Sequence, residues 1–415
     1  MKNKPKSIIY KCRLLAFIIL VECVISGFLL GMCPIESLAE AGKLYALNAC
    51  LYDGDNERVL FEKNGYEAKP MASTTKIMTC IIALEYGNLE DIVEVSKYAA
   101  SMPKVKLGAV AGEKYRLGDL LYSLMLESHN DSAVIIAEHV SGSVEEFAKL
   151  MNEKARDLQC INTYFITPNG LDATKEENGI IRQHSTTAAE LCKIMSYCIK
   201  NPDFLKITQT QSYSFSDKKV SGNGGVVNGA RVHTVTNKNA FLTMMEGAVS
   251  GKTGFTGGAG YCYVGALKRD GKTLIVALLG CGWPNNKGYK WKDTMYLMKY
   301  GLDNYYYKTI NEEYFPTPIK VNNGISGDKR GEVIIYPQIV REEFGLLCSD
   351  EEKITTEIEL NNCLEAPVKS NEIVGYFIYK INGKEVFREK IQIVENVEKY
   401  NIIWCLERLL KMFFL

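Results

Sequence analysis

The sequence lacks an excess of charge of either sign. Its 49 lysine and arginine residues balance 49 aspartate and glutamate residues, so the formal net charge is zero. A protein that binds nucleic acid needs a basic surface, and no basic patch with interleaved aromatic residues is present. The sequence therefore predicts no nucleic-acid partner.

Metal-binding patterns are also missing. The four histidines, at positions 129, 139, 184 and 233, form no His-x-x-x-His pair, and the 13 cysteines include no Cys-x-x-Cys pair. Structural zinc sites use such closely spaced ligands, so we expect no metal site. Scattered cysteines are unusual in an exported chain and favour a weakly oxidising environment.

The N-terminus has the pattern of an export signal. Five basic residues precede an apolar stretch over residues 14–32, and Ser37-Leu38-Ala39 then offers small residues to a signal peptidase. We predict a signal peptide at residues 1–39. The stretch is also long enough for an uncleaved membrane anchor, although Glu22 in its middle disfavours a stable span. In both cases the rest of the chain lies outside the cytoplasmic membrane, at its outer face or in the cell-wall space.

The next segment mixes strands and helices in a fixed order. Strands open it, helices fill its middle, and strands with one helix close it, which predicts an α+β domain over residues 40–310. Its sheet is assembled from both ends of the segment, with a helical insert between them. The expected strands cover residues 43–53, 58–62, 212–215, 231–235, 248–250, 260–268 and 272–280, and the expected helices cover 117–126, 132–140, 144–158, 185–199 and 290–305.

The C-terminal part has a different pattern. Short β-branched segments separated by turns predict a small β-sandwich domain over residues 316–396. The last residues, 400–415, follow a helical spacing with apolar residues on one face and charged residues on the other. This segment is too short to span a bilayer, so we expect an amphipathic helix that lies in the membrane interface, with packing on its own protein as the alternative. The apolar residues are Ile402, Leu406, Leu409 and Phe413, and the charged ones are Glu407, Arg408 and Lys411.

A candidate nucleophile lies in Ser73-Thr74-Thr75-Lys76. Residues three apart on a helix share a face, so the Lys76 amine can reach the Ser73 hydroxyl. A serine needs a base to take its proton, and a lysine serves as that base only when its pKa is lowered, for example by burial in the apolar run that follows. The spacing alone is weak evidence, because a helix N-cap followed by a solvated lysine looks the same. We assign no function to the same spacing at Ser216-Asp217-Lys218-Lys219, in an expected Gly- and Lys-rich loop.

Two further motifs strengthen the prediction that Ser73 is a nucleophile. Ser128-His129-Asn130 falls in an expected break between two helices, and Lys252-Thr253-Gly254 follows the expected strand 248–250. Ser-x-x-Lys, Ser-x-Asn and Lys-Thr-Gly in this order are the constellation of serine acyl transferases that act on penicillins and D-alanyl peptides. Ser221-Gly222-Asn223 also matches Ser-x-Asn, but it belongs to the same expected loop as the second Ser-x-x-Lys.

The sequence around these motifs resembles the low-molecular-mass penicillin-binding proteins, which are serine-type D-Ala-D-Ala carboxypeptidases. The resemblance covers residues 43–307 and implies a serine β-lactamase/DD-peptidase-like fold, an antiparallel sheet with a helical insert. The flanks of Ala366-Pro367-Val368-Lys369 and the tail resemble that family's C-terminal β-domain and membrane anchor. His129 departs from the family, since glycine is expected there. The segments that carry the resemblance are Ser128–Ser132, Thr167–Leu171, His184–Thr186 and Gly251–Cys262.

The resemblance implies roles in acyl transfer. Ser73 attacks the carbonyl of the terminal D-Ala-D-Ala bond and becomes the acyl-ester, and Lys76 takes its proton. Ser128 relays that proton to the leaving amine, and Asn130 positions the substrate amide. The chemistry requires no metal and no organic cofactor. The implied partners are a peptidoglycan stem peptide and, as covalent inhibitors, β-lactams.

The resemblance also implies how substrate is held. Lys252 and Thr253 bind the free carboxylate of the terminal D-alanine. Gly254 allows substrate backbone to approach the strand edge. The backbone N–H groups of Ser73 and Phe255 hold the oxyanion.

Three alternatives use the same residues. A class A β-lactamase needs a Glu-x-x-Leu-Asn string before Lys252, but that string occurs only at Glu357–Asn361, in the β-domain, so we expect β-lactams to stay bound to Ser73. A DD-endopeptidase that cuts cross-links is the second alternative. The third is a non-catalytic wall-binding protein with a decayed site.

Overall fold

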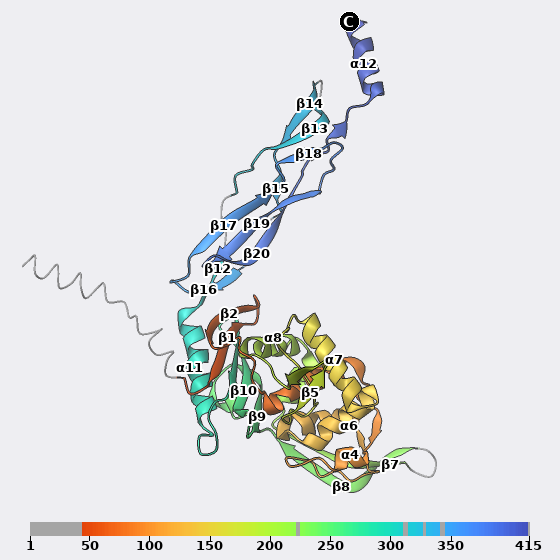
Figure 1. Ribbon diagram of the computed structural model, residues 1–415, viewed down its shortest axis with the longest axis vertical. Helices are drawn as coiled ribbons and strands as arrows, with labels where there is room; N and C mark the ends of the chain where they lie inside the picture. The colour runs from red at the N-terminus through yellow and green to blue at the C-terminus, as the bar shows by residue number, and fades with distance from the viewer. Residues whose placement is uncertain (1–43, 221–224, 310–313, 327–328, 341–344, 414–415) are drawn as a thin grey trace, which may run out of the picture.

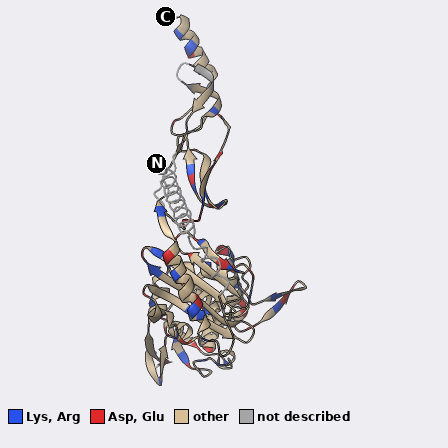
Figure 2. Ribbon diagram, turned by 90° about the vertical axis from the view of Figure 1, so that its left-hand side faces the viewer, with Lys and Arg blue, Asp and Glu red and all other residues tan. Residues whose placement is uncertain are grey.

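The computed structural model describes residues 44–220, 225–309, 314–326, 329–340 and 345–413. It has a globular α+β part, an elongated β-domain that extends away from it, and a helix at the far end (Figure 1). Both signs of charge are interspersed over the globular part (Figure 2). The expected signal peptide, residues 1–39, lies outside the described residues.

A five-stranded antiparallel sheet forms the centre of the globular part. Its strand order is β2-β1-β11-β10-β9, so the N-terminal hairpin pairs with strands from residue 248 onward, and the prediction of a sheet assembled from both ends is confirmed. β9 is the edge strand. The bounds are β1 Asn48–Asp53, β2 Arg58–Lys63, β9 Ala248–Thr256, β10 Gly260–Arg269 and β11 Lys272–Leu279.

The sheet is covered on both faces. Alternate residues of β1 enter two different cores: Cys50 and Tyr52 pack with helix α8 (Ala188–Cys198), whereas Ala49 and Leu51 pack with helix α11 (Tyr289–Asn304). Because neither face contacts solvent, every residue of β1 and β11 is buried.

Strand β9 is longer than the sequence predicted. We expected a strand over 248–250 with Lys252-Thr253-Gly254 beyond its end, but these residues lie inside β9, where Lys252 pairs with Val264 and Gly254 with Cys262. Lysine and glycine carry a weak strand signal of their own, and the partner strand β10 supplies the backbone hydrogen bonds.

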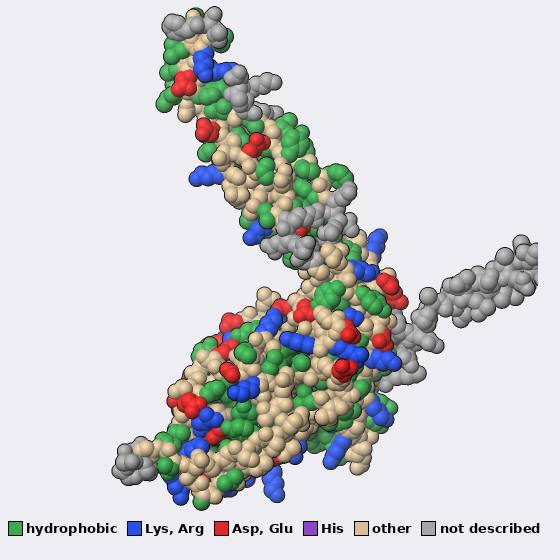
Figure 3. Space-filling view, turned by 180° about the vertical axis from the view of Figure 1, so that it is seen from behind, with side chains coloured by type: hydrophobic (Ala, Val, Ile, Leu, Met, Phe, Trp, Pro, Cys, Tyr) green, Lys and Arg blue, Asp and Glu red, His purple; other side chains and the backbone are tan. Residues whose placement is uncertain are grey.

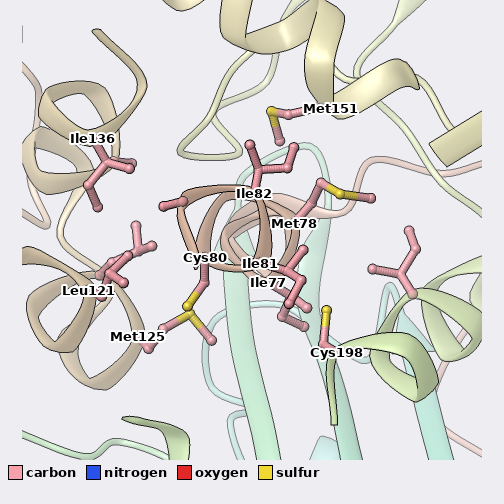
Figure 4. Packing of buried hydrophobic residues seen from close by; sticks show 14 of the residues in the cluster. Ile77, Met78, Cys80, Ile81, Ile82, Leu121, Met125, Ile136, Met151 and Cys198 are labelled. Atoms are coloured by element: carbon pink, nitrogen blue, oxygen red, sulfur yellow. The ribbon is translucent and has the colours of Figure 1, made fainter. Parts of the chain in front are cut away.

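The helical insert is built around helix α3 (Lys76–Tyr86). Eight successive residues of α3, from Lys76 to Ala83, are buried, which is typical of a helix surrounded by protein on every side. Figure 4 shows Cys80 of this helix directed toward Leu121 and Met125. The other helical elements of the insert are η2 Ala72–Thr75, α4 Lys97–Ala100, α5 Leu117–Tyr122, η3 Ser123–Glu127 (π-helical), α6 Asn130–Ser141, α7 Val144–Asp157, α9 Pro202–Gln209 and α10 Phe241–Met244.

A second sheet carries a long hairpin whose extent the sequence did not predict. Strand β7 (Ser212–Val220) contains Ser216–Lys219, so the expectation of a loop there is wrong. Polar residues form a strand at this place because they pair with β8 (Val226–Thr236), for example Lys218 with Asn228. Ser221-Gly222-Asn223 lies outside the described residues. The sheet has the order β3-β4-β7-β8, with β3 Ile92–Glu94 and β4 Lys114–Arg116, and a separate hairpin joins β5 Thr174–Glu177 to β6 Ile180–Gln183.

The C-terminal part is all β. Two sheets, β14-β13-β18 with β21 beside β13, and β15-β20-β19-β17, enclose one core cluster. Strand β12, which follows α11 directly, pairs with β16 of this part. The bounds are β12 Tyr306–Thr309, β13 Ile319–Ser326, β14 Lys329–Ile335, β15 Gln338–Ile339, β16 Gly345–Cys348, β17 Ile354–Leu360, β18 Cys363–Glu365, β19 Ile373–Ile381, β20 Lys384–Gln392 and β21 Glu398–Lys399.

An ion pair connects the two parts. Arg58 of β2 donates from Nη1 to Glu352 Oε1 at 2.6 Å and from Nη2 to Glu352 Oε2 at 3.1 Å. The same guanidinium also donates to the Leu347 carbonyl of β16. A bidentate pair with both side chains largely buried fixes orientation as well as distance.

Helix α12 (Ile402–Phe413) ends the described chain. None of its residues is buried, and its apolar side chains are exposed, including Ile402 at 78% and Phe413 at 81%. Within the part of the chain that the structure describes, no helix is long and apolar enough to cross a membrane.

Candidate active site

The candidate nucleophile lies on a short 3-10 turn, η2, that leads into α3. The turn begins with Ala72 in a left-handed conformation (φ +48°), and the Thr75 hydroxyl donates to the Ala72 carbonyl at 2.8 Å. Gly170, itself at φ +82°, packs so closely against this carbonyl that a Cβ atom at position 170 would meet it at 2.0 Å. The turn that carries Ser73 is therefore held from two sides.

The Lys76 amine is placed against the Ser73 hydroxyl. Its Nζ lies 2.8 Å from Ser73 Oγ, 2.9 Å from Asn130 Oδ1 and 2.6 Å from the Asn169 carbonyl. An unprotonated amine has two hydrogens and one lone pair, so it can donate to the two carbonyl oxygens and accept the proton of Ser73.

The environment of Lys76 favours that unprotonated form. The residue is fully buried, and burial lowers its pKa well below the usual value, with the nearby Lys252 cation acting in the same direction. Asp131 acts in the opposite direction, but its carboxylate accepts four backbone N–H groups, from Leu107, Gly108, Ala109 and Ser132. Lys76 has the properties of a general base.

Ser128 has a free hydroxyl beside this pair. It follows the π-helical turn η3 in a left-handed conformation (φ 69°, ψ 33°), and within the described ranges its Oγ has no hydrogen-bond partner. Asn130, in the first turn of α6, turns its carbonyl oxygen to Lys76 and donates from Nδ2 to the Pro103 carbonyl.

His129, the departure from the family, has a structural explanation. Its side chain is buried, with Nδ1 2.8 Å from the Ser123 hydroxyl and Nε2 3.4 Å from Glu127. Burial lowers its pKa. The imidazole therefore braces the loop that carries Ser128.

The Lys-Thr-Gly motif approaches Ser73 from the edge of the sheet. Lys252 is 3% exposed, and burial lowers its pKa to about 7. Gly254 faces the nucleophile turn, because a Cβ atom there would lie 2.9 Å from Ser73 N and 3.1 Å from Thr74 N. The close approach of the two backbones requires glycine. Phe255, the next residue, is 42% exposed.

One cavity of about 680 Å³ joins these elements. Seven of the eight site residues predicted from the sequence line this cavity. The eighth, Lys76, is hydrogen-bonded to Ser73. The predicted residues that line it are Ser73, Ser128, Asn130, Lys252, Thr253, Gly254 and Phe255. In the described parts of the chain, no three His, Cys, Asp or Glu side chains gather as metal ligands.

Several residues that shape this site had no predicted role. The Asn169 carbonyl accepts from Lys76, and His184 Nε2 lies 2.8 Å from the Thr75 hydroxyl. The His184 Nδ1 atom accepts from the backbone N–H of Ile166, so Nε2 carries the proton, and burial lowers the pKa of this ring to about 3. Both residues lie in segments that carry the family resemblance, and that resemblance was the only indication in the sequence that they belong to the site.

The cavity also has a wall that no motif indicated. It is formed by Tyr261 of β10 and by residues at the start of α11, among them Lys290 and Trp291. Their proximity depends on how α11 packs on the sheet, and no local spacing in the sequence shows it.

Comparisons with known proteins agree with this geometry. The family model described as D-alanyl-D-alanine carboxypeptidase matches residues 36–282, and the one described as penicillin-binding protein 5, C-terminal domain, matches residues 340–399. The chain is 27% identical over 375 residues to D-alanyl-D-alanine carboxypeptidase DacF of Bacillus subtilis, covering 88% of both chains. It is 32% identical over 228 residues to D-alanyl-D-alanine carboxypeptidase DacB2 of Mycobacterium tuberculosis, covering 55% of this chain and 72% of the relative.

A solved structure shares the fold over most of the length. The D-alanyl-D-alanine carboxypeptidase DacD from Francisella tularensis superposes with a TM-score of 0.62 at 23% identity. The match covers 86% of this chain and 94% of that one, so the likeness includes the β-domain as well as the globular part.

Proposed function

This chain belongs to the D-alanyl-D-alanine carboxypeptidase family, and we propose that it removes the terminal D-alanine from peptidoglycan stem peptides through an acyl-enzyme on Ser73. The observation that carries the proposal is the 2.8 Å contact between Lys76 Nζ and Ser73 Oγ, made by an amine whose pKa burial lowers well below its usual value.

Acylation starts when Lys76 takes the hydroxyl proton and Ser73 Oγ attacks the carbonyl of the D-Ala-D-Ala bond. The carbonyl oxygen gains negative charge and accepts the backbone N–H groups of Ser73 and Phe255. This assignment is supported by the close approach of Gly254, the residue before Phe255, to Ser73 N.

The leaving group departs with a proton from Ser128. As the C–N bond breaks, the Ser128 hydroxyl passes its proton to the D-alanine nitrogen and regains one from the protonated Lys76. The free Ser128 Oγ at the cavity wall supports this role. Asn130 accepts a hydrogen bond from the Lys76 amine and so orients it toward Ser73. In this proposal its amide also binds the substrate backbone. Water then hydrolyses the ester, and the same groups move the proton in the reverse direction.

Lys252 and Thr253 bind the terminal carboxylate. A charge-assisted contact of this kind explains why a carboxypeptidase needs a fixed cation beside its nucleophile. The Glu357–Asn361 string that resembles a β-lactamase motif lies on β17 and its end, in the β-domain. Glu127, the one carboxylate among the cavity-lining residues, is paired with Lys238 at 3.3 Å.

We also propose where the enzyme works. A signal peptide at residues 1–39 exports the chain, the domain over 40–310 carries the chemistry, and the β-sandwich over 316–396 holds it away from the membrane. The amphipathic helix in residues 400–415 attaches the protein to the outer face of the cytoplasmic membrane. The unburied apolar side chains of α12 support the last step.

The test separates a carboxypeptidase from a DD-endopeptidase. A pentapeptide that ends in D-Ala-D-Ala and a cross-linked dimer are offered side by side to protein that lacks residues 1–39, and free D-alanine and dimer loss are measured. We expect D-alanine release from the pentapeptide at the higher kcat/KM. Dimer cleavage without D-alanine release would favour the endopeptidase, and neither reaction would favour a wall-binding protein.

A further inference from the structure

Ser128 has an unusual backbone conformation for a residue that delivers a proton to the leaving group. It lies in the left-handed region (φ 69°, ψ 33°), which is unfavourable for a residue with a Cβ atom. Within the described ranges its Oγ has no hydrogen-bond partner, so its own side chain does not hold it there. The orientation of this hydroxyl therefore depends on the residues on either side, Glu127 and His129.

The Glu127 carboxylate ties the residue before Ser128 to strand β8. Its Oε1 accepts the backbone N–H of Thr236, the last residue of β8, at 3.0 Å, and lies 3.3 Å from Lys238 Nζ. The Lys238 backbone N–H in turn donates to the Leu126 carbonyl at 3.1 Å. Position 127 is thus held through its side chain and through the residue before it.

The His129 imidazole ties the residue after Ser128 to two helical elements. Its Nδ1 lies 2.8 Å from the Ser123 hydroxyl of η3, and that hydroxyl lies 2.7 Å from the Ser132 hydroxyl of α6. All three residues are buried. Because burial lowers the pKa of His129, its ring is neutral at neutral pH and has one nitrogen that accepts a hydrogen bond.

The two flanking side chains also contact each other. His129 Nε2 lies 3.4 Å from Glu127 Oε2. A carboxylate can only accept, so the ring proton belongs on Nε2, and Nδ1 accepts from Ser123. One continuous set of contacts therefore runs from β8 past Ser128 to η3 and α6. Glycine, which the family resemblance leads us to expect at position 129, could make none of the imidazole contacts.

We propose that Glu127 and His129 are positioning residues that hold the Ser128 hydroxyl toward the nitrogen of the leaving D-alanine. They act through Ser128, so they matter most in the step in which the C–N bond breaks and the nitrogen takes a proton from Ser128. This inference rests on the proposed function, because the role of Ser128 comes from it.

The experiment compares a leaving group that needs a proton with one that does not. An amide nitrogen leaves only when it is protonated, whereas a thioester sulfur leaves as the thiolate. A peptide that ends in D-Ala-D-Ala and its thioester analogue, with sulfur in place of the scissile nitrogen, form the same acyl-enzyme on Ser73. The measurement is kcat/KM for each substrate, and the ratio of the two values isolates protonation of the leaving group.

We expect this ratio, peptide to thioester, to fall by about tenfold in His129→Ala, since the proton donor is displaced but still present. Ser123→Ala should lower the ratio in the same direction, because it removes the hydroxyl at Nδ1 and leaves the residues that line the cavity unchanged. The activity on the thioester shows at the same time that each variant is folded.

His139→Ala is the matched control. His139 also lies on α6, but it is exposed, its Nε2 lies 3.0 Å from Asp91 Oδ2, and it does not line the cavity. This variant should keep the wild-type ratio.

Two results would overturn the inference while leaving the proposed function intact. One is an unchanged ratio in His129→Ala. The other is an equal loss for the peptide and the thioester, which would mean that His129 only stabilises the loop. If the wild-type protein released no D-alanine from the peptide, the proposed function itself would fail, and the role of Ser128 with it.

Discussion

Lys76 differs from an ordinary lysine because it is fully buried, and not merely because of its position in a motif. The two carbonyl oxygens that surround its amine carry no formal charge, so they hold a proton on Lys76 less strongly than a carboxylate would. Asp131, the carboxylate that could hold a proton on Lys76, is occupied by backbone N–H groups. The spacing of Ser73 and Lys76 could be read from the sequence, but this electrostatic setting comes from segments 50 to 100 residues away.

At this scale we predict a two-sided pH profile. Lys76 must lose its proton to act as a base, so kcat/KM rises with pH through its lowered pKa. Lys252 must keep its proton to bind the carboxylate, so kcat/KM falls as the pH rises past about 7. Both limbs are measured as D-alanine release against pH.

Lys252→Arg provides the check on the alkaline limb. A guanidinium stays protonated throughout the accessible range, so in this variant the decline should move to higher pH, whatever the loss in absolute rate. If the decline of kcat/KM occurs at the same pH in Lys252→Arg as in the wild-type protein, the decline is caused by another group.

Two structural elements, the turn η2 and the edge strand β9, meet at Gly254. A methyl group at this position would press on the backbone nitrogens of Ser73 and Thr74, and neither can move without displacing the nucleophile. We predict that Gly254→Ala slows acylation by benzylpenicillin by about tenfold to hundredfold with little change in Tm.

Gly257→Ala is the control for this prediction, because a Cβ atom there would have nothing within 4 Å. The second-order acylation rate of each variant is the measurement. Equal rates for Gly254→Ala and the wild-type protein would show that the close approach of η2 and β9 does not matter for the chemistry.

The elements also show where sequence reasoning works. The apolar strands β1, β10 and β11 and the helices around Leu121 and Ile136 were predicted from the sequence. The spacing of apolar residues within each segment indicates which of its side chains are buried. Strands β9 and β7 were predicted too short. Their extended conformation depends on pairing with the partner strands β10 and β8 more than on their own residue types. Helix α9 was missed although Asn201 caps it and Pro202 opens it, a signal that its short length obscured.

The same distinction applies to the site. Eight residues could be predicted because three motifs occur in a known order. Lys290 and Tyr261 could not, because α11 and β10 meet only in the folded chain.

The whole molecule places the cavity and the tail far apart. The β-domain extends from the globular part and ends in α12 (Figure 1), and hydrophobic side chains are visible along that end (Figure 3). The Arg58–Glu352 pair fixes the joint between the two parts. This arrangement fits our proposal that the protein is attached to the membrane at one end and acts on peptidoglycan at the other.

At this scale we predict that the tail binds lipid. Protein that lacks residues 1–39 should sediment with vesicles of zwitterionic and anionic phospholipid, and removal of residues 401–415 should abolish this, because each buried Leu, Ile or Phe side chain contributes about 1.5–3 kcal/mol. Leu406→Asp with Leu409→Asp should act like the deletion, whereas Glu407→Gln should not. Unchanged sedimentation after the deletion would mean that α12 has another partner.

The most direct test of the account is the intact mass of the protein after exposure to benzylpenicillin. Ser73 is activated by Lys76, and Glu127, the carboxylate among the cavity-lining residues that the structure describes, is paired with Lys238. We therefore predict one covalent adduct on Ser73 that persists for many minutes, and none in Ser73→Ala. An adduct on another residue, rapid turnover of the penicillin, or no adduct in the wild-type protein would contradict the assignment of Ser73 as the nucleophile of a D-Ala-D-Ala carboxypeptidase.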